Sequence, residues 1–263
     1  MTVACDAIIL AGGELNSELR KIAAQDTEGL ILIGSFPMIH YVYTAVRATP
    51  GIDRIVICGP QDALAAILPR DERLFFTAGG DTAIESFRNA VDFLRTQESN
   101  SRLLVLPVDI PLITMEAIHD FMERCSELEG DFFYSIVSRE ISQEQYPEQV
   151  RTYVHLKEGD FTGGNLIMVK RDSWEQVADW AEELVRRRKN PVAMARLFGL
   201  RLTMLLLLRR LSISATEQRV SKVLGLRGRA VITPYAEIGI DVDKISDLNV
   251  VKNYLAKNSY LEV

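Results

Sequence analysis

Two acidic segments of the chain carry side chains suited to binding a divalent cation. Asp109 follows the apolar run Leu103–Leu106, which predicts a central strand ending where parallel sheets place their ligands. Asp241 and Asp243 stand two residues apart, so in an extended segment both carboxylates would face one side. Mg²⁺ prefers oxygen ligands and commonly bridges to substrate phosphates. On these residues alone two alternatives stay open, a helix-capping role for Asp109 and a solvated turn for the 241–243 pair.

Three glycine pairs could bring the backbone close to a ligand. In Leu10-Ala11-Gly12-Gly13 the pair ends an apolar run, which predicts a buried strand and a tight loop whose N–H groups could hold phosphate. Gly79-Gly80 precedes Glu85-Ser86 on a predicted helix. Ordinary turns are the alternative for both. Thr162-Gly163-Gly164-Asn165, placed before the predicted strand Leu166–Val169, is more suggestive because strands normally avoid glycine unless a backbone or ligand approaches.

Basic side chains lie just before the third glycine pair. Arg151, His155 and Lys157 fall on alternate positions in and around the predicted strand Thr152–Leu156, where they could form a positive face for a phosphate or carboxylate. A solvated edge strand is the alternative. The histidines lack metal-ligand spacing, and neither GxGxxG nor GxxxxGK[ST] is present, so nicotinamide and P-loop sites lose their main support.

Composition narrows the class of protein. The 263 residues include 30 Lys+Arg and 36 Asp+Glu, and the net charge of -6 argues against a bulk electrostatic grip on nucleic acid. Three isolated cysteines favour neither a disulfide framework nor a zinc site. The longest apolar run, Leu202–Leu208, is too short to span a bilayer, and no signal peptide is apparent. We expect a cytoplasmic protein without a membrane span.

The elements that must position these residues alternate strand, loop and helix up to about residue 127. This rhythm predicts a right-handed parallel α/β sheet with its ligands beyond the carboxyl ends of the strands. Thr82 or Asp81 is expected to cap one helix and Thr114 the next. A single domain over residues 1–263 is predicted, with a helical insertion at about 172–225. Because Leu202–Leu208 is apolar on all sides, we expect either a buried helical turn or a partner contact there, including a homo-oligomer.

Several segments together resemble the MobA-like NTP transferase family. These segments are Leu10–Gly13, Leu30–Met38, Gly79-Gly80 with Glu85-Ser86, Val108–Leu112, Thr162–Asn165 and Asp241–Leu248. Each motif is short, but their joint order is fairly specific and spans most of the chain outside 172–225. The resemblance implies the glycosyltransferase A-type fold of nucleotide-diphospho-sugar transferases, a three-layer α/β/α arrangement with a mostly parallel mixed sheet.

The resemblance also implies roles for individual residues. Those for nucleotide binding are Leu10, Ala11, Gly12, Gly13, Gly80 and Ser86, and those for acceptor binding are Gly164 and Asn165. Arg151 and Lys157 are added as acceptor-binding residues from their alternate spacing rather than from the resemblance. Asp109 and Asp243 would be catalytic and would bind Mg²⁺ (or Mn²⁺), with Asp241 as a helper. An NTP would donate its NMP to a small phosphorylated acceptor and release pyrophosphate, through positioning and neutralisation of charge.

One position departs from the family pattern. A lysine usually stands before the Leu30–Gly34 segment and touches the phosphates, whereas here that position falls on or near Glu28, whose carboxylate would repel a triphosphate. Arg20 or Lys21 could supply the missing charge. The departure motivates a second hypothesis, a non-catalytic nucleotide- or sugar-nucleotide-binding protein. A third, a metal-dependent glycosyltransferase, is weaker because the Asp109 segment lacks DxD spacing.

Overall fold

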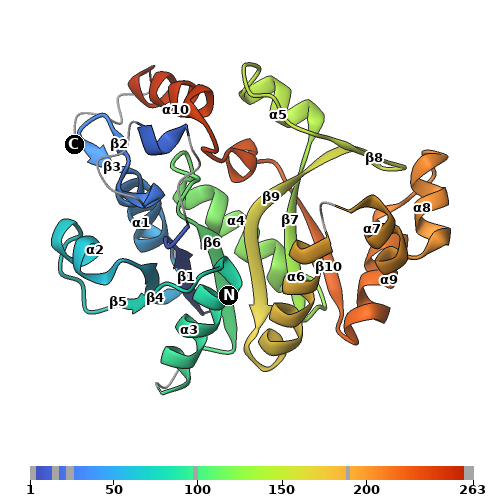
Figure 1. The fold of residues 1–263 in the computed structure, drawn as a ribbon, viewed down its shortest axis with the longest axis horizontal. Helices are drawn as coiled ribbons and strands as arrows, with labels where there is room; N and C mark the ends of the chain where they lie inside the picture. The colour runs from blue at the N-terminus through green and yellow to red at the C-terminus, as the bar shows by residue number, and fades with distance from the viewer. Residues whose placement is uncertain (1–3, 14–17, 22–26, 97–99, 188–189, 258–263) are drawn as a thin grey trace.

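A mixed sheet runs through the centre of the molecule (Figure 1). The computed structural model describes residues 4–13, 18–21, 27–96, 100–187 and 190–257, and within them eight strands form this sheet in the order β10-β7-β9-β6-β1-β4-β5, with β8 paired to β9. The strands are β1 (Cys5–Leu10), β4 (Ile52–Gly59), β5 (Leu74–Ala78), β6 (Arg102–Pro107), β7 (Phe132–Ser138), β8 (Val154–Leu156), β9 (Gly159–Lys170) and β10 (Gly228–Thr233). A separate two-stranded ribbon pairs β2 (Leu32–Ile33) with β3 (Phe36–Pro37).

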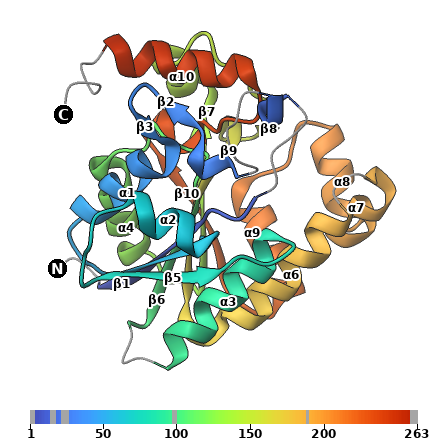
Figure 2. The same cartoon turned by 60° about the vertical axis from the view of Figure 1, so that its left-hand side comes forward.

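Helices cover both faces of the sheet. They are α1 (Met38–Ala48), α2 (Gln61–Ile67), α3 (Ala83–Arg95), α4 (Met115–Glu127), α5 (Arg139–Gln145), α6 (Trp174–Arg187), α7 (Pro191–Phe198), α8 (Leu200–Leu207), α9 (Ile213–Leu224) and α10 (Ile245–Lys257). On one face α1 and α4 pack through Ile39 and Phe121, and on the other α3 and α6 pack through Phe87 and Trp174 (Figure 2). The central strand β1 is buried on both faces, which explains its continuous apolar run. The predicted three-layer α/β/α fold is confirmed.

Strand β9 divides the sheet into two parallel halves. It runs antiparallel to β6 on one side and to β7 on the other, while β6, β1, β4 and β5 are mutually parallel and β7 is parallel to β10. The third glycine pair was expected before a strand over 166–169, and this was wrong. The strand begins at Gly159, so Gly163 and Gly164 lie inside it, beside a bulge in the pairing with β7.

Local capping signals hold where they were expected. The Thr82 side chain accepts a hydrogen bond from the Glu85 N–H, and Thr114 accepts one from Ala117, so each threonine caps its helix. Asp247 lies in the first turn of α10, and its Oδ2 accepts from the N–H groups of Asp243 and Lys244 at 3.2 and 3.1 Å.

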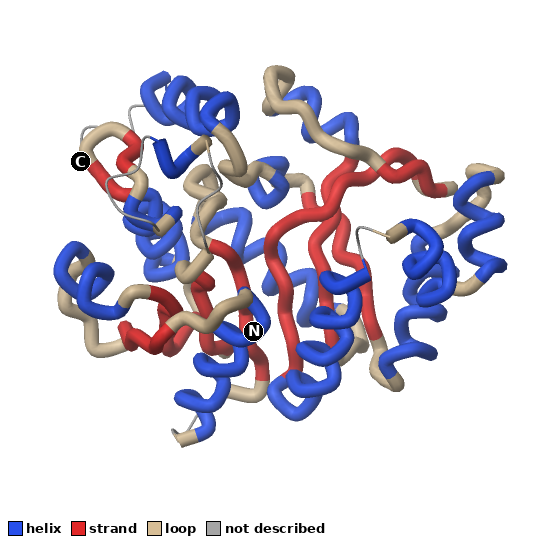
Figure 3. Tube along the Cα trace, in the orientation of Figure 1, coloured by secondary structure: helices blue, strands red, loops and turns tan. Residues whose placement is uncertain are grey.

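The segment in which a helical insertion was predicted folds into α6, α7, α8 and α9, and the β8–β9 hairpin reaches toward these helices (Figure 3). That the segment is an insertion stays a prediction. The Lys157 N–H donates to the carbonyl of Leu211, and the Ile213 N–H donates to the Glu158 carboxylate. The expected buried turn over 202–208 was wrong, because Leu207 is 72% exposed and Leu208 60% exposed. A partner contact at this end of α8 stays a prediction.

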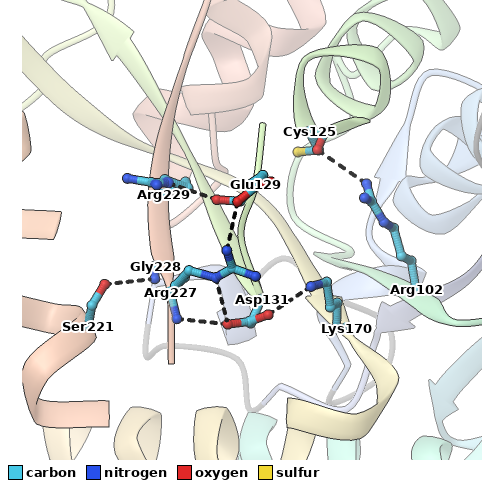
Figure 4. Close-up of polar contacts among 9 residues, drawn as sticks. All are labelled: Arg102, Cys125, Glu129, Asp131, Lys170, Ser221, Arg227, Gly228 and Arg229. Carbon is cyan, nitrogen blue, oxygen red and sulfur yellow. Dashed lines mark hydrogen bonds and ion pairs between the residues drawn. The ribbon is translucent and has the colours of Figure 1, made fainter. Parts of the chain in front are cut away.

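A charged cluster fixes the edge of the sheet formed by the start of β7, the start of β10 and the end of β9. Asp131 accepts from the Lys170 ammonium at 2.8 Å and from the Arg227 N–H at 2.9 Å (Figure 4). The hydrogen bond from Lys170 holds the pKa of the Asp131 carboxyl below its usual range. This cluster lies at the amino ends of β7 and β10 and therefore leaves their carboxyl ends for a ligand site.

Candidate functional site

The loop after β1 is held against the ends of its two neighbouring strands. The Ala11 N–H donates to the carbonyl of Cys58 at 2.7 Å, and the Val108 N–H donates to that of Leu10 at 3.0 Å. A Cβ at Gly59 would lie 2.8 Å from the Ala11 carbonyl oxygen, so only glycine allows this approach. The carboxyl edge of the sheet thus presents Gly12 and the exposed Gly13 beyond a buried Ala11.

The first two glycine pairs meet at this edge. A Cβ at Gly12 would lie 3.4 Å from the Cα of Gly79 and 3.5 Å from the Oγ of Ser86. The Gly80 N–H donates to that same Oγ at 2.9 Å, and the Ser86 side chain is buried. The predicted nucleotide-binding residues therefore lie together, although they are well separated in sequence.

The two acidic segments also meet there. The Val242 N–H donates to the carbonyl oxygen of Asp109 at 2.8 Å, which places Asp241 and Asp243 on either side of that contact. Val242 is fully buried, so the segment is anchored between its two carboxylates. The Oδ1 atom of Asp109 is buried, and no group in the described part of the chain hydrogen-bonds it. A buried acceptor without a partner is costly unless a ligand satisfies it.

The predicted acceptor residues Arg151, Gly164 and Asn165 make contacts with the segments around the second acidic pair. Arg151 forms an ion pair with Asp241, and its second terminal nitrogen lies 3.5 Å from the Gly163 carbonyl oxygen. Asn165 donates to the carbonyl of Ile238 at 3.1 Å, and a Cβ at Gly164 would collide with Ser135 and Ile238. These contacts hold the 3₁₀ turn Ala236–Gly239 that leads to the second acidic segment.

The basic side chains around β8 do not share one partner. Arg151 precedes the short strand, His155 Nδ1 lies 2.6 Å from Asp160 Oδ1, and Lys157 is exposed in the hairpin turn. Strand β8 covers Val154–Leu156, two residues fewer than the expected Thr152–Leu156. Of the three basic residues predicted to share one face of this strand, only His155 therefore lies within it. That Arg151 and Lys157 bind the acceptor stays a prediction.

A sequence model of the MobA-like NTP transferase domain matches residues 7–221. The chain belongs to this family. Its matched region contains Asp109 and all three glycine pairs, whereas Asp241 and Asp243 lie beyond it. No curated protein matches the chain in sequence.

Solved structures support the family fold. A structure from Thermus thermophilus titled a hypothetical transferase is 32% identical, covering 94% of this chain and 100% of its own, with a TM-score of 0.79. A CMP:2-keto-3-deoxy-manno-octonic acid synthetase in complex with CTP is 12% identical over 97% of this chain and 100% of its own, with a TM-score of 0.59. The Francisella tularensis 2-C-methyl-D-erythritol 4-phosphate cytidylyltransferase is 12% identical over 95% and 99%, with a TM-score of 0.60. At 12% identity these two likenesses show the fold alone.

Glu28, on or near which the family resemblance implies a lysine, lies close enough to the second acidic segment to be influenced by its charges. A Cβ at Gly13 would lie 3.1 Å from the Glu28 carboxylate, which places this side chain against the first glycine loop. Burial, together with the charges of Asp243 and Asp241, raises the pKa of Glu28 to about 7. Arg20 and Lys21 are exposed in a short 3₁₀ turn over Leu19–Lys21. The family member described here thus places a carboxylic acid beside its glycine loop.

The four carboxylates repel one another. Burial raises the pKa of Asp109 well above its usual value, and the charges of Glu28, Asp241 and Asp243 raise it further. The pKa of Asp243 is raised by burial and by Asp241 and Asp247. An added cation would relieve this repulsion, so the site favours positive charge.

The residues present fit a divalent cation only when the substrate completes its coordination. Within the described ranges, no group of three or more His, Cys, Asp or Glu side chains is arranged to hold a metal ion. Asp109 nevertheless offers a buried Oδ1 without a partner, and Mg²⁺ is commonly held by one or two carboxylates plus substrate phosphates. Asp109 and Asp243 would hold the ion, with phosphate and water as its other ligands.

Sequence reasoning missed Tyr134. This side chain extends from β7 over Gly163, where an added Cβ would collide with its hydroxyl. Burial raises the pKa of Tyr134, which also responds to the charges of Arg151 and Asp241. The alternation of Phe132, Tyr134 and Ile136 could have placed it on one face of the strand, but not beside the acidic segment.

Proposed function

We propose that this family member is a divalent-cation-dependent nucleotidyltransferase that transfers NMP from an NTP to a small phosphorylated acceptor. The proposal is carried by the Val242–Asp109 backbone hydrogen bond, which gathers both acidic segments beside the Gly12-Gly13 loop. Family membership supports the reaction class, and the buried Asp109 Oδ1 supports the cation.

In the proposed reaction an acceptor phosphate oxygen bonds to the α-phosphorus of the NTP. The bond from that phosphorus to the bridging oxygen breaks, and pyrophosphate leaves with the electron pair. When bound, Mg²⁺ or Mn²⁺ neutralises charge that develops on the phosphate oxygens. The chain contributes the glycine loop that admits the phosphates, the Gly80–Ser86 contact that shapes the nucleotide end, and Arg151 as a positive group at the acceptor end.

Thermal denaturation with each of the four NTPs, with and without MgCl₂ or MnCl₂, tests binding. One NTP with cation should raise the melting temperature by about 5 °C at 100 times its dissociation constant. Asp109→Asn should abolish that rise, whereas the exposed Asp92→Asn should keep it. No rise with any NTP would contradict the proposal. Pyrophosphate release across a panel of sugar and alcohol phosphates then tests turnover.

A second function is favoured by Glu28. Because a carboxylate near the glycine loop weakens the attraction for a triphosphate, the chain could bind a nucleotide or a nucleotide sugar without transferring it. Saturable binding without pyrophosphate release for any acceptor would support this function. Sugar transfer from a nucleotide sugar would instead indicate a glycosyltransferase.

A further inference from the structure

A cavity of about 460 Å³ lies between the sheet and the helical insertion. Strands β7, β8, β9 and β10 form its floor, and α6, α7 and α9 form its walls. Its principal apolar lining residues are Ile136, Ile167, Trp180, Leu184, Phe198 and Val220. The volume falls within the roughly 300–1,000 Å³ typical of small-molecule sites.

The charged groups in the cavity wall are already paired with protein atoms. Arg229 lies 3.2 Å from the Glu217 carboxylate, which also accepts from the Ala230 N–H at 2.9 Å. The Thr216 hydroxyl donates to the Ser212 carbonyl at 3.0 Å. The wall therefore offers an occupant apolar contact rather than charge, and such cavities take hydrocarbon rather than water.

One end of the cavity adjoins the acceptor side of the candidate site. Val154, which lies three residues after Arg151, lines the cavity and is 45% exposed, so it forms part of the rim. Tyr134 lines the cavity too, and its hydroxyl end lies over Gly163, whose carbonyl faces Arg151. Arg151 already pairs with the Asp241 carboxylate, so an anionic group at this rim would share the guanidinium with Asp241 and would accept a hydrogen bond from the Tyr134 hydroxyl.

We propose that this cavity binds the hydrocarbon chain of an amphiphilic phosphate, whose phosphate lies at the Arg151 and Tyr134 rim. The inference rests on the proposed function, because this phosphate would be the acceptor. A 150 Å³ apolar cavity accepts benzene, so about 460 Å³ accepts a chain on the order of ten or more carbon atoms. The chain would also restore packing contacts that an apolar cavity lacks.

Calorimetric titration of the full chain with ethyl, octyl and dodecyl phosphate, each below its micellar concentration, tests the assignment. The dissociation constant should fall roughly two- to fourfold per added methylene until the chain fills the cavity. A dissociation constant that does not change with chain length would overturn the proposal.

Two variants on α6 distinguish binding inside the cavity from binding on the protein surface. Ala181→Phe on α6 narrows the cavity and should weaken dodecyl phosphate at least tenfold, while the exposed Gln176→Phe on the same helix should not. Ile213→Ala enlarges the cavity and should shift the preference toward longer chains, which keeps the test valid if Ala181→Phe does not fold. Equal dodecyl phosphate binding by well-folded Ala181→Phe and Gln176→Phe would indicate surface adsorption and overturn the proposal.

The phosphate end is tested by comparing octyl phosphate with octyl glucoside. The wild-type protein should prefer the phosphate, and Arg151→Gln should lose that preference while retaining chain binding. A protein dimer that Ala181→Phe or dodecyl phosphate dissociates would assign the cavity to a second copy of the chain and overturn the proposal.

Transfer is then measured separately as pyrophosphate release from NTP and Mg²⁺. Release that rises with acceptor chain length supports the proposal. Release with short phosphates but no dependence of binding or rate on chain length refutes the cavity assignment and leaves nucleotidyl transfer standing. Chain-dependent binding without release from any NTP refutes the acceptor role of the amphiphilic phosphate. The proposed function is then contradicted only if the sugar and alcohol phosphates also give no release.

Discussion

The backbone N–H of Val242 donates a 2.8 Å hydrogen bond to the carbonyl oxygen of Asp109. The two residues follow strands that are not neighbours, because β9 and β7 separate β6 from β10 in the sheet. The turn Ala236–Gly239 contacts β7 and β9 on its way to Asp109. This crossing concentrates three carboxylates, with Glu28 as a fourth, at one sheet edge.

Asp109→Asn should stabilise the ligand-free protein at pH 8. The substitution keeps the side-chain size but removes the Asp109 carboxyl group, whose pKa is raised by burial and by three nearby carboxylates. Each 1 kcal/mol gained would raise the melting temperature by about 2–4 °C in a protein of this size. Thermal denaturation checks the prediction, with Asp92→Asn, at an exposed position, as the control. A lower melting temperature for Asp109→Asn alone would contradict it.

Stability should fall as the pH rises from about 4.5 to about 7. The folded protein raises the pKa of Glu28 to about 7, so folding favours its protonated form and loses stability as that proton leaves. Glu28→Gln should flatten the melting-temperature profile across this window, whereas Glu72→Gln, at an exposed position, should not. MgCl₂ should stabilise the wild type more at pH 8 than at pH 5. Identical pH profiles for wild type and Glu28→Gln would show that Glu28 is not responsible.

Glu28→Lys should strengthen NTP binding. The change removes a repelling carboxylate beside Gly13 and places a basic group on or near the position where the family resemblance implies a lysine. Calorimetric titration in the presence of MgCl₂ should give a dissociation constant roughly tenfold lower than that of the wild type. Weaker binding by a normally folded Glu28→Lys would indicate that the carboxylate itself contributes to holding the ligand.

Ser86→Ala should weaken the nucleotide end of the site. The Oγ of Ser86 accepts from the Gly80 N–H, and its loss should cost about 1 kcal/mol and lower the melting temperature by about 3 °C. NTP binding should weaken severalfold because the second glycine pair loses its support. Ser126→Ala removes a hydroxyl that bonds only within α4 and serves as the matched control. Unchanged NTP affinity in Ser86→Ala would show that the Gly80–Ser86 contact does not support nucleotide binding.

Gly164→Ala should displace the turn that carries the second acidic segment. The new Cβ would collide with the Ser135 and Ile238 side chains, with a cost of about 1–3 kcal/mol. The cation-dependent thermal shift should also shrink, because Asp241 and Asp243 follow this turn. Gly225→Ala provides the comparison: its φ of +71° makes alanine strained, but no atom lies within 4 Å, so the shift should persist. Equal shifts in both variants would mean that the turn tolerates the methyl group.

Local sequence patterns predicted the helices and strands better than the contacts between them. Thr82 and Thr114 cap helices because short polar side chains next to an apolar period are a local signal. The start of β9 was predicted too late in the sequence because glycines usually interrupt strands. Here Gly163 pairs with β7 and Gly164 lies close to Ile238, and neither contact can be read from the local sequence. Helices α2 and α5, with seven residues each, carry too short a periodic signal to stand out.

The candidate site was predictable as a set of motifs but not as a geometry. Asp109 was found from its place after a central strand, yet its contact with Val242 depends on a turn that crosses two other strands. Glu28 was flagged by its charge, but its approach to Gly13 and its raised pKa follow from burial. The cavity beside Tyr134 had no sequence signal, because it arises from the spacing between a sheet and helices that pack over it.

The contact between Val242 and Asp109 also sets when the site can form during synthesis on the ribosome. It joins positions that are about half the chain apart, and the intervening residues include the whole helical insertion. Contacts over such separations form late, since a long loop must close first. A nascent chain that has emerged only as far as α9 already contains Asp109 and the glycine loop but not the acidic segment that follows β10. Such a chain would hold an incomplete site, and cation-dependent nucleotide binding would begin only after that last segment docks.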